Sequence, residues 1–206
     1  MICKQSKIRR QDRKLIVLIF FFFILCEILP LSGFSAEIYH SESEKATLPN
    51  EAKASERIFN LRGLSNVGRV SPGIYRGTQP LPEGYDTLKK MGVRTVINLR
   101  SKHSEKNTVE ASGMKSIEVP FSVLKDVNIE KVNSLIDIMI NPDNQPVYVH
   151  CKLGQDRTGI VIAAYRIRVD RWSLKEAEAE MQAFGFNDLW YELKEFIRNY
   201  AKSLSK

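Results

Sequence analysis

The sequence predicts an α/β domain whose central, mainly parallel β-sheet is flanked by helices on both sides. Short apolar and β-branched runs, such as VRTVINLR at 93–100 and PVYVH at 146–150, alternate with longer segments of helical periodicity. This alternation is typical of parallel sheets, because the crossover between two parallel strands usually contains a helix. With 206 residues, of which 43% are hydrophobic and 27% charged, the chain is large enough for one globular domain with a sizeable core.

The first half of this domain is expected to contain a short strand, a helix, a buried strand, a short helix and another strand, at residues 73–77, 81–92, 93–100, 104–112 and 115–119. The first helix ends at Gly92, because glycine adopts the left-handed conformation that often follows a helix end. The β-branched, apolar character of 93–100 favours a buried strand.

The second half is expected to contain a helix, a strand and three further helices, at residues 128–140, 146–150, 158–168, 173–185 and 188–203. The first of these helices begins behind a capping Asn and carries apolar residues at the spacing of one helical face. The helix at 158–168 is apolar enough to lie deep in the core. SLKE at 173–176 is a capping-box sequence, which predicts the start of the next helix.

The chain divides into three regions. Residues 1–35 are interpreted as a signal peptide or signal anchor. Residues 36–68 are polar and weakly patterned, so they are interpreted as a linker or tail. Residues 69–206 are expected to form the folded domain, which we expect to be a monomer.

The N-terminal region has the layout of an export signal. Residues 1–14 are basic, and twelve apolar residues, LIVLIFFFFILC, follow at 15–26. Gly33 and Ser35 supply the small residues expected at positions −3 and −1 of a cleavage site. Twelve residues are fewer than the roughly 20 that span a bilayer. We therefore expect an exported protein, periplasmic or secreted, with anchoring through an uncleaved signal as the alternative.

The charge of the domain suits a small anionic substrate. Residues 1–35 hold six basic and two acidic residues, so this region carries +4 of the formal charge of +7, and +3 remains for the rest. No zinc-finger spacing, RNA-binding signature or long basic stripe is present. Nucleic acid is therefore not expected as a partner, and a membrane is expected only through the N-terminal segment.

One cysteine remains in the mature domain. Cys3 and Cys26 lie in the region expected to be removed, which leaves Cys151. A lone cysteine cannot form an internal disulfide, so its sulfur stays available for chemistry. The three histidines and this cysteine are scattered without metal-ligand spacing, so no metal site is expected.

The segment HCKLGQDRTG, at 150–159, predicts an anion-binding loop between a strand and a helix. Gly154 assists a tight turn, and the loop amides and the positive end of the helix can point at one anion. The Arg157 guanidinium can grip two oxygens of that anion. A cysteine that faces this loop would be held as a thiolate. The segment therefore combines a nucleophile, Cys151, with a receptor for a tetrahedral anion. This combination indicates phosphoryl transfer through a phosphocysteine.

The same segment matches His-Cys-x5-Arg-Ser/Thr-Gly and resembles the signature of the protein tyrosine phosphatase superfamily. Together with GIYRGTQP and GVRTVINLR, it resembles an atypical dual-specificity phosphatase over roughly residues 68–200. The resemblance implies a phosphomonoesterase that needs no metal or other cofactor.

By this resemblance, Cys151 is the nucleophile, Arg157 binds the phosphate, and the Thr158 hydroxyl eases departure of the thiolate. His150 would orient the loop from beneath, or it is simply a buried, hydrogen-bonded histidine. The phosphate oxygens would be held by the amides of Lys152, Leu153, Gly154, Gln155, Asp156 and Arg157.

The resemblance also implies a general acid on a separate loop before the cysteine. Asp126, in PFSVLKD, has a suitable position between a strand and a helix. Asp156 is the alternative, because some relatives that act on phosphoinositides carry an Asp at this place of the loop.

Arg76 and Arg100 each close a strand at the edge expected to hold the site, where they would reach the substrate or form surface salt bridges.

The substrate is a phosphorylated protein or a small phosphorylated molecule. The main hypothesis is hydrolysis of phosphotyrosine, phosphoserine or phosphothreonine in proteins. Phosphoinositides or inositol polyphosphates are the alternative, although Lys152 is the one lysine of the anion loop. A non-catalytic phosphate-binding module is a further alternative, which the presence of both Cys151 and Arg157 disfavours.

Overall fold

Six strands form one mixed sheet with the spatial order β1-β2-β3-β6-β4-β5 in the computed structural model, which describes residues 54–120, 122 and 127–204. The strands β3, β6, β4 and β5 are parallel to one another, whereas β2 pairs antiparallel with β3 and β1 pairs antiparallel with β2. The predicted α/β class with a mostly parallel sheet is therefore confirmed. The strands are β1 Glu56–Ile58, β2 Val67–Ser71, β3 Ile74–Gly77, β4 Thr95–Asn98, β5 Lys115–Glu118 and β6 Val147–His150.

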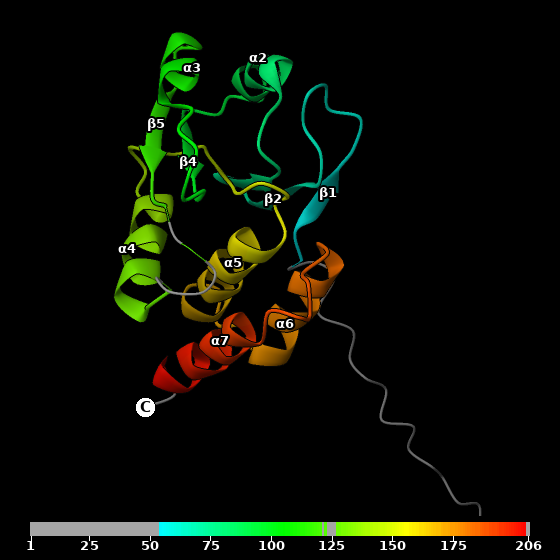
Figure 1. Ribbon diagram of the computed structural model, residues 1–206, viewed down its shortest axis with the longest axis vertical. Helices are drawn as coiled ribbons and strands as arrows, with labels where there is room; N and C mark the ends of the chain where they lie inside the picture. The colour runs from blue at the N-terminus through cyan, green and yellow to red at the C-terminus, as the bar shows by residue number, and fades with distance from the viewer. Residues whose placement is uncertain (1–53, 121, 123–126, 205–206) are drawn as a thin grey trace, which may run out of the picture. The chain divides into compact units, whose positions relative to one another are not determined.

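Helices cover both faces of the sheet. Figure 1 shows α2 and α3 on one side of the strands and α4, α5, α6 and α7 on the other. The central strand β6 is thus enclosed from both sides, and all four of its residues are buried. The helices are α2 Pro82–Lys90, α3 Lys106–Ala111, α4 Ile129–Ile140, α5 Asp156–Arg168, α6 Leu174–Ala183 and α7 Tyr191–Leu204.

The larger core surrounds α5. Every residue of this helix from Thr158 to Ile167 is buried, and α5 contacts α4, α6 and α7 as well as β6. An α-helix enclosed in this way is mostly apolar, which explains the apolar run that predicted it; the buried Arg166 is the exception and is paired with Glu180. A smaller core on the opposite face joins Leu88 and Val109 to Val96 and Tyr148 of the sheet.

Two predicted helix caps are present. The Asn128 side chain accepts a hydrogen bond from the Lys131 amide at 2.8 Å and so opens α4. Ser173 and Glu176 form a complete capping box at the start of α6. The starts of α4 and α6 were therefore predictable from local sequence, because a cap needs only residues within one turn.

The predicted linker over 36–68 extends too far along the chain. Residues 56–58 form β1, which pairs with β2, and the Ser55 amide donates to Glu180 at 2.7 Å. The domain therefore begins before residue 69, at least as early as residue 55. The stretch was misinterpreted because β1 has three residues and no alternating pattern, and its stability comes from pairing with a distant segment.

Some predicted features lie outside the described residues. These are the N-terminal region 1–35, most of the expected linker, and Asp126. Within the described ranges, no helix is long and apolar enough to cross a membrane.

Candidate active site

The loop from Cys151 to Gln155 joins the central strand β6 to the central helix α5. Cys151 directly follows β6 and is 3% exposed, while Asp156 and Arg157 form the first turn of α5. Arg157 is half-buried, and its Nη1 donates to the Leu99 carbonyl at 3.4 Å. The predicted strand–loop–helix arrangement is confirmed, with the helix beginning at Asp156 and not at Thr158.

The carbonyl oxygens of this loop are all held from outside. Each one from Cys151 to Gln155 accepts a hydrogen bond of 2.7 to 3.3 Å. In chain order, the donors are His150 Nδ1, the Gln79 amide, Asn66 Nδ2, Arg76 Nη2 and the Gly159 amide. In a trans peptide the C=O of one residue and the N–H of the next point in opposite directions. The N–H groups from Lys152 to Asp156 therefore point to the side of the loop opposite to these carbonyls.

The amides of the loop have no hydrogen-bond partner among the residues that the structure describes. Within the described part of the chain, none from Lys152 to Arg157 donates a hydrogen bond. Gly154 makes the turn possible: its φ is +67°, and a Cβ there would lie 2.4 Å from the Gly77 carbonyl oxygen. Successive free amides at the start of a buried helix form a receptor for an anion, with Cys151 at its base.

His150 is clamped between the loop and a buried carboxylate. Its Nδ1 faces the Cys151 carbonyl at 3.0 Å, and its Nε2 lies 2.5 Å from Glu105 Oε1. Glu105 Oε2 accepts from the Tyr85 hydroxyl at 2.7 Å. Burial alone would raise the pKa of Glu105, but the hydrogen bonds and charge of His150, with Tyr85, hold it below its ordinary value. Glu105 is therefore an ionised, buried carboxylate.

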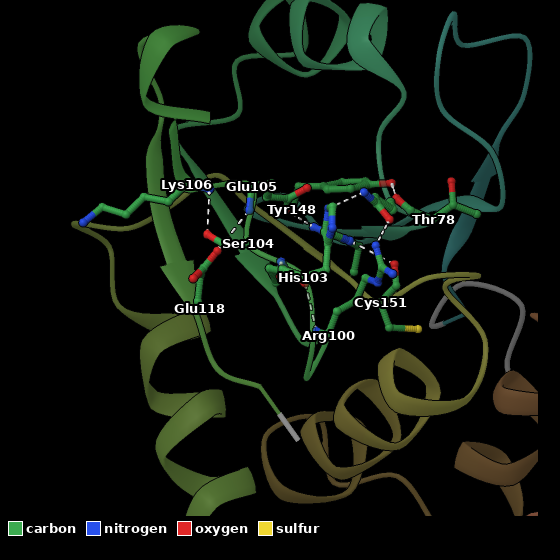
Figure 2. A network of polar contacts seen from close by, with 12 residues as sticks. Thr78, Arg100, His103, Ser104, Glu105, Lys106, Glu118, Tyr148 and Cys151 are labelled. Carbon is green, nitrogen blue, oxygen red and sulfur yellow. Dashed lines mark hydrogen bonds and ion pairs between the residues drawn. The ribbon is translucent and has the colours of Figure 1, made fainter. Parts of the chain in front are cut away.

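Figure 2 shows how the segment after β4 reaches this site. Arg100, His103 and Glu105 project from it toward the strand end that carries Cys151. Gln79 joins two of them, because its side-chain amide contacts both Arg100 Nη1 and His103 Nε2. Arg100 thus lies at the predicted sheet edge but is held by Gln79; no salt bridge to it is present among the described residues.

The other predicted site residues are placed as follows. Thr158 is fully buried, and its hydroxyl has no hydrogen-bond partner within the described part of the chain. Asp156 is half-buried, and its Oδ1 accepts from the Asn187 amide at 3.0 Å, so one carboxylate oxygen has a structural bond. Asp126 lies between β5 and α4, outside the described residues, so its expected role stays a prediction.

Arg76 is not on the surface. It closes β3 as predicted, but it is 0% exposed and lies behind the loop, where it donates to Gly154. The expectation of substrate contact or a surface salt bridge is therefore wrong for this residue. Its strand is covered because β2 and α6, which sequence patterns did not place there, close over it.

Sequence reasoning missed Asn66, Gln79 and Glu105. Glu105 follows β4 at the same sheet edge as Cys151, where sites in α/β proteins lie, and this position was a usable signal. Asn66 and Gln79 carry no such signal. Asn66 Nδ2 donates to the Leu153, Gly154 and Phe184 carbonyls, and the Gln79 amide donates to the Lys152 carbonyl, so both act through partners far along the chain. Among the described residues, no group of three or more His, Cys, Asp or Glu side chains could hold a metal ion.

Comparison with known proteins agrees with this geometry. Residues 63–206 match the model of the tyrosine phosphatase family. The dual specificity protein phosphatase TpbA of Pseudomonas aeruginosa is 27% identical over 165 residues, covering 80% of this chain and 72% of TpbA.

Two solved structures have the same fold. A TpbA variant of P. aeruginosa in complex with pTyr aligns with a TM-score of 0.64 at 23% identity, covering 76% of this chain and 99% of that one. The core catalytic domain of the PP-IP phosphatase SIW14 from Saccharomyces cerevisiae aligns with a TM-score of 0.60 at 26% identity, covering 68% and 88%. The family match spans more than half of the sequence and includes the whole loop described above. The chain therefore belongs to the tyrosine phosphatase family and is a phosphatase.

Proposed function

We propose that the protein hydrolyses phosphomonoesters through a phosphocysteine on Cys151, with phosphotyrosine in proteins as its preferred substrate. The observation that carries the mechanism is the anion loop itself, in which the carbonyls from Cys151 to Gln155 are held outward and the amides from Lys152 to Arg157 have no partner among the described residues. Such fixed donors stabilise the charge on a transferring phosphoryl group without reorganisation during the reaction.

The reaction has two steps. The Cys151 sulfur attacks phosphorus, an S–P bond forms, the ester P–O bond breaks, and the leaving oxygen takes a proton from a carboxylic acid. Water then attacks the phosphocysteine and returns a proton to that carboxylate, and the S–P bond breaks to release inorganic phosphate and the thiolate. Arg157 grips two phosphoryl oxygens, and the Thr158 hydroxyl, which is buried and unpartnered within the described residues, stabilises the departing thiolate.

Asp126 is the proposed proton donor. Its rival, Asp156, already accepts a hydrogen bond from the Asn187 amide, which favours a structural role for that carboxylate. The position of Asp126 in the chain, between β5 and α4 and ahead of Cys151, supports the assignment.

The surroundings of the loop favour an aryl phosphate. A pocket of about 330 Å³ borders the loop, and its lining includes Leu64, Leu81 and Leu153, the hydroxyls of Ser65 and Thr78, and Lys152 as the one charged residue. A largely apolar pocket with a few polar groups next to the loop suits an aromatic part of the substrate. A polyphosphorylated inositol would need several cations. The relative TpbA, whose structure holds pTyr, supports the same choice.

An inositol diphosphate is the second candidate. The similarity to SIW14 favours it, as do Arg100 and His103, which Gln79 holds together at the catalytic edge. The test is turnover of phosphotyrosine and phosphoserine peptides, phosphoinositides and inositol polyphosphates, with a chelator present throughout. A higher kcat/KM for phosphotyrosine peptides supports the proposal, and a higher value for an inositol substrate overturns the substrate choice.

Export is also proposed, either with cleavage near residue 35 or with the N-terminal segment kept as a membrane anchor. Its support is the basic region followed by twelve apolar residues and small residues at 33 and 35. The catalytic domain acts as a monomer in this proposal.

A further inference from the structure

The Arg76 side chain lies buried beneath the anion loop. It is 0% exposed, and its Nη2 donates to the Gly154 carbonyl at 3.1 Å. Its Nε and Nη1 are also buried and make no hydrogen bond within the described part of the chain. No carboxylate among the described residues forms an ion pair with it. The site of the phosphatase therefore contains a cation that no direct partner neutralises.

The surroundings of Arg76 are shaped to hold it. Its guanidinium lies 3.9 Å from the centre of the Phe184 ring. Gly68 makes room for this stack, because a Cβ there would lie 2.6 Å from the Phe184 ring and 3.3 Å from Arg76 Cγ. The Phe184 face attracts the cation, but an aromatic face compensates only part of the cost of burying a charge.

The buried charge of Arg76 lies behind the loop that begins at Cys151, since its guanidinium bonds the Gly154 carbonyl of that loop. Burial lowers the pKa of Arg76 to about 10, and the nearby cations Arg57 and Arg166 act in the same direction, while the negative charges of Glu180 and of ionised Cys151 oppose it. At neutral pH the guanidinium is therefore still charged. Coupling is reciprocal: if the thiolate stabilises the cation, the cation stabilises the thiolate. A purely structural position would be filled at lower cost by an apolar side chain of the same volume.

The hydrogen bond from Arg76 to the Gly154 carbonyl also orients a peptide unit of the loop. The Gly154 carbonyl belongs to the same peptide unit as the Gln155 amide, and the two groups point in opposite directions. When Arg76 holds the carbonyl outward, the Gln155 amide is turned to the side of the loop that receives the anion. Arg76 thus affects the site through its charge and through its hydrogen bond to Gly154, without touching the substrate.

We propose that Arg76 is a positioning residue for the phosphatase reaction, which holds Cys151 as a thiolate through its buried charge and orients the Gln155 amide through Gly154. This inference rests on the proposed function of Cys151 as the nucleophile. It assigns a role to a residue outside the Cys-x5-Arg loop, on a strand that lies beside β6 in the sheet.

The test compares Arg76→Met, which removes the charge at similar length, with Arg76→Lys, which restores a charge. Arg69→Met is the matched control, because Arg69 lies on the adjacent strand, is about half exposed and pairs with Glu56. The first readout is the pH dependence of alkylation of Cys151 by iodoacetamide, followed on the Cys151 peptide by mass spectrometry. The second is kcat/KM for a small aryl phosphate.

For Arg76→Met we expect the alkylation midpoint to move to higher pH, because a buried positive charge behind the loop is lost. We expect kcat/KM to fall by about 10²-fold or more. Arg76→Lys should return the midpoint toward that of the wild type but recover only part of kcat/KM. Arg69→Met should match the wild type in both readouts.

A folded Arg76→Met with the midpoint and kcat/KM of the wild type overturns the inference. If Arg76→Met does not fold, Arg76→Gln, which is neutral but keeps a hydrogen-bond donor, decides by the same two readouts. Failure of the proposed function would give a different result. The wild type, with Arg76 in place, would then show no turnover that depends on Cys151.

Discussion

Glu105 and His150 form a buried pair beneath the anion loop, with Glu105 Oε1 2.5 Å from His150 Nε2 while Nδ1 of the same ring faces the Cys151 carbonyl. A carboxylate and a carbonyl can only accept, and the pKa of Glu105 is held below its ordinary value. The ring of His150, the residue before Cys151, is therefore held at both of its nitrogens, by Glu105 on one side and by the loop on the other.

Glu105→Gln should lower the free energy of unfolding by about 1–3 kcal/mol at pH 7, because it removes a buried charge from a satisfied pair. The pKa of Glu105 is lower in the folded state, so its contribution is complete above the unfolded value of about 4.3 and is lost as the pH falls further. Denaturant unfolding at pH 7 and at low pH measures this.

The control for this variant is Glu110→Gln on α3, an exposed residue 3.9 Å from Lys106, which should change stability by less than about 0.5 kcal/mol. A Glu105→Gln variant that is as stable as the wild type at pH 7 would contradict a stabilising role for the ionised Glu105 carboxylate. So would a deficit that grows on acidification.

Arg157→Lys should reduce kcat/KM for an aryl phosphate by about 10²–10³-fold, because a lysine ammonium cannot supply two parallel hydrogen bonds to the phosphoryl oxygens. Arg168→Lys, at the other end of α5 and paired with Asp137, is the matched control and should leave turnover unchanged. Steady-state kinetics checks both variants. If kcat/KM fell equally in Arg157→Lys and Arg168→Lys, the loss would reflect a general effect on α5 and not a role of Arg157 in phosphate binding.

Asp126→Asn should reduce turnover of an alkyl phosphate by about 10²–10⁴-fold, because its poor leaving group needs a proton. The loss should be much smaller for an activated aryl phosphate, whose oxygen departs as an anion. The basic limb of the pH–rate profile should also disappear. If Asp156→Asn shows this leaving-group dependence and Asp126→Asn does not, the donor belongs to the anion loop.

Expression of the full chain should yield a product outside the cytoplasm that lacks about the first 35 residues. The reason is the basic segment followed by twelve apolar residues and the small residues Gly33 and Ser35. N-terminal sequencing of the mature protein checks the cleavage. A membrane-bound product with Met1 intact would support the anchor, and a soluble cytoplasmic product with Met1 intact would refute export.

The features that could be predicted from the sequence are local ones. The loop at 150–159 contains its nucleophile, its turn glycine and its arginine within ten residues, and the caps at Asn128 and Ser173 need one helical turn each. The burial of α5 in the core was predictable from its apolar composition. These features depend on short stretches of chain, so pattern and propensity describe them well.

The features that could not be predicted depend on distant partners. Glu105 and His150 are 45 residues apart, and Arg76 is 78 residues from the Gly154 carbonyl that it binds. The strand β1 is stable only because β2 pairs with it. A single sequence does not state which far segments meet, so the parts of the site that hold the loop from outside became visible only in the fold.

The most direct test of the account is to trap the covalent intermediate. The enzyme is mixed with an excess of aryl phosphate, quenched in acid within one turnover, digested and analysed by mass spectrometry for a phosphoryl group. The account predicts that this group lies on the Cys151 peptide in the wild type and is absent in folded Cys151→Ser, which should also have no turnover. Turnover in Cys151→Ser, or a phosphoryl group on another residue of an active enzyme, would contradict it.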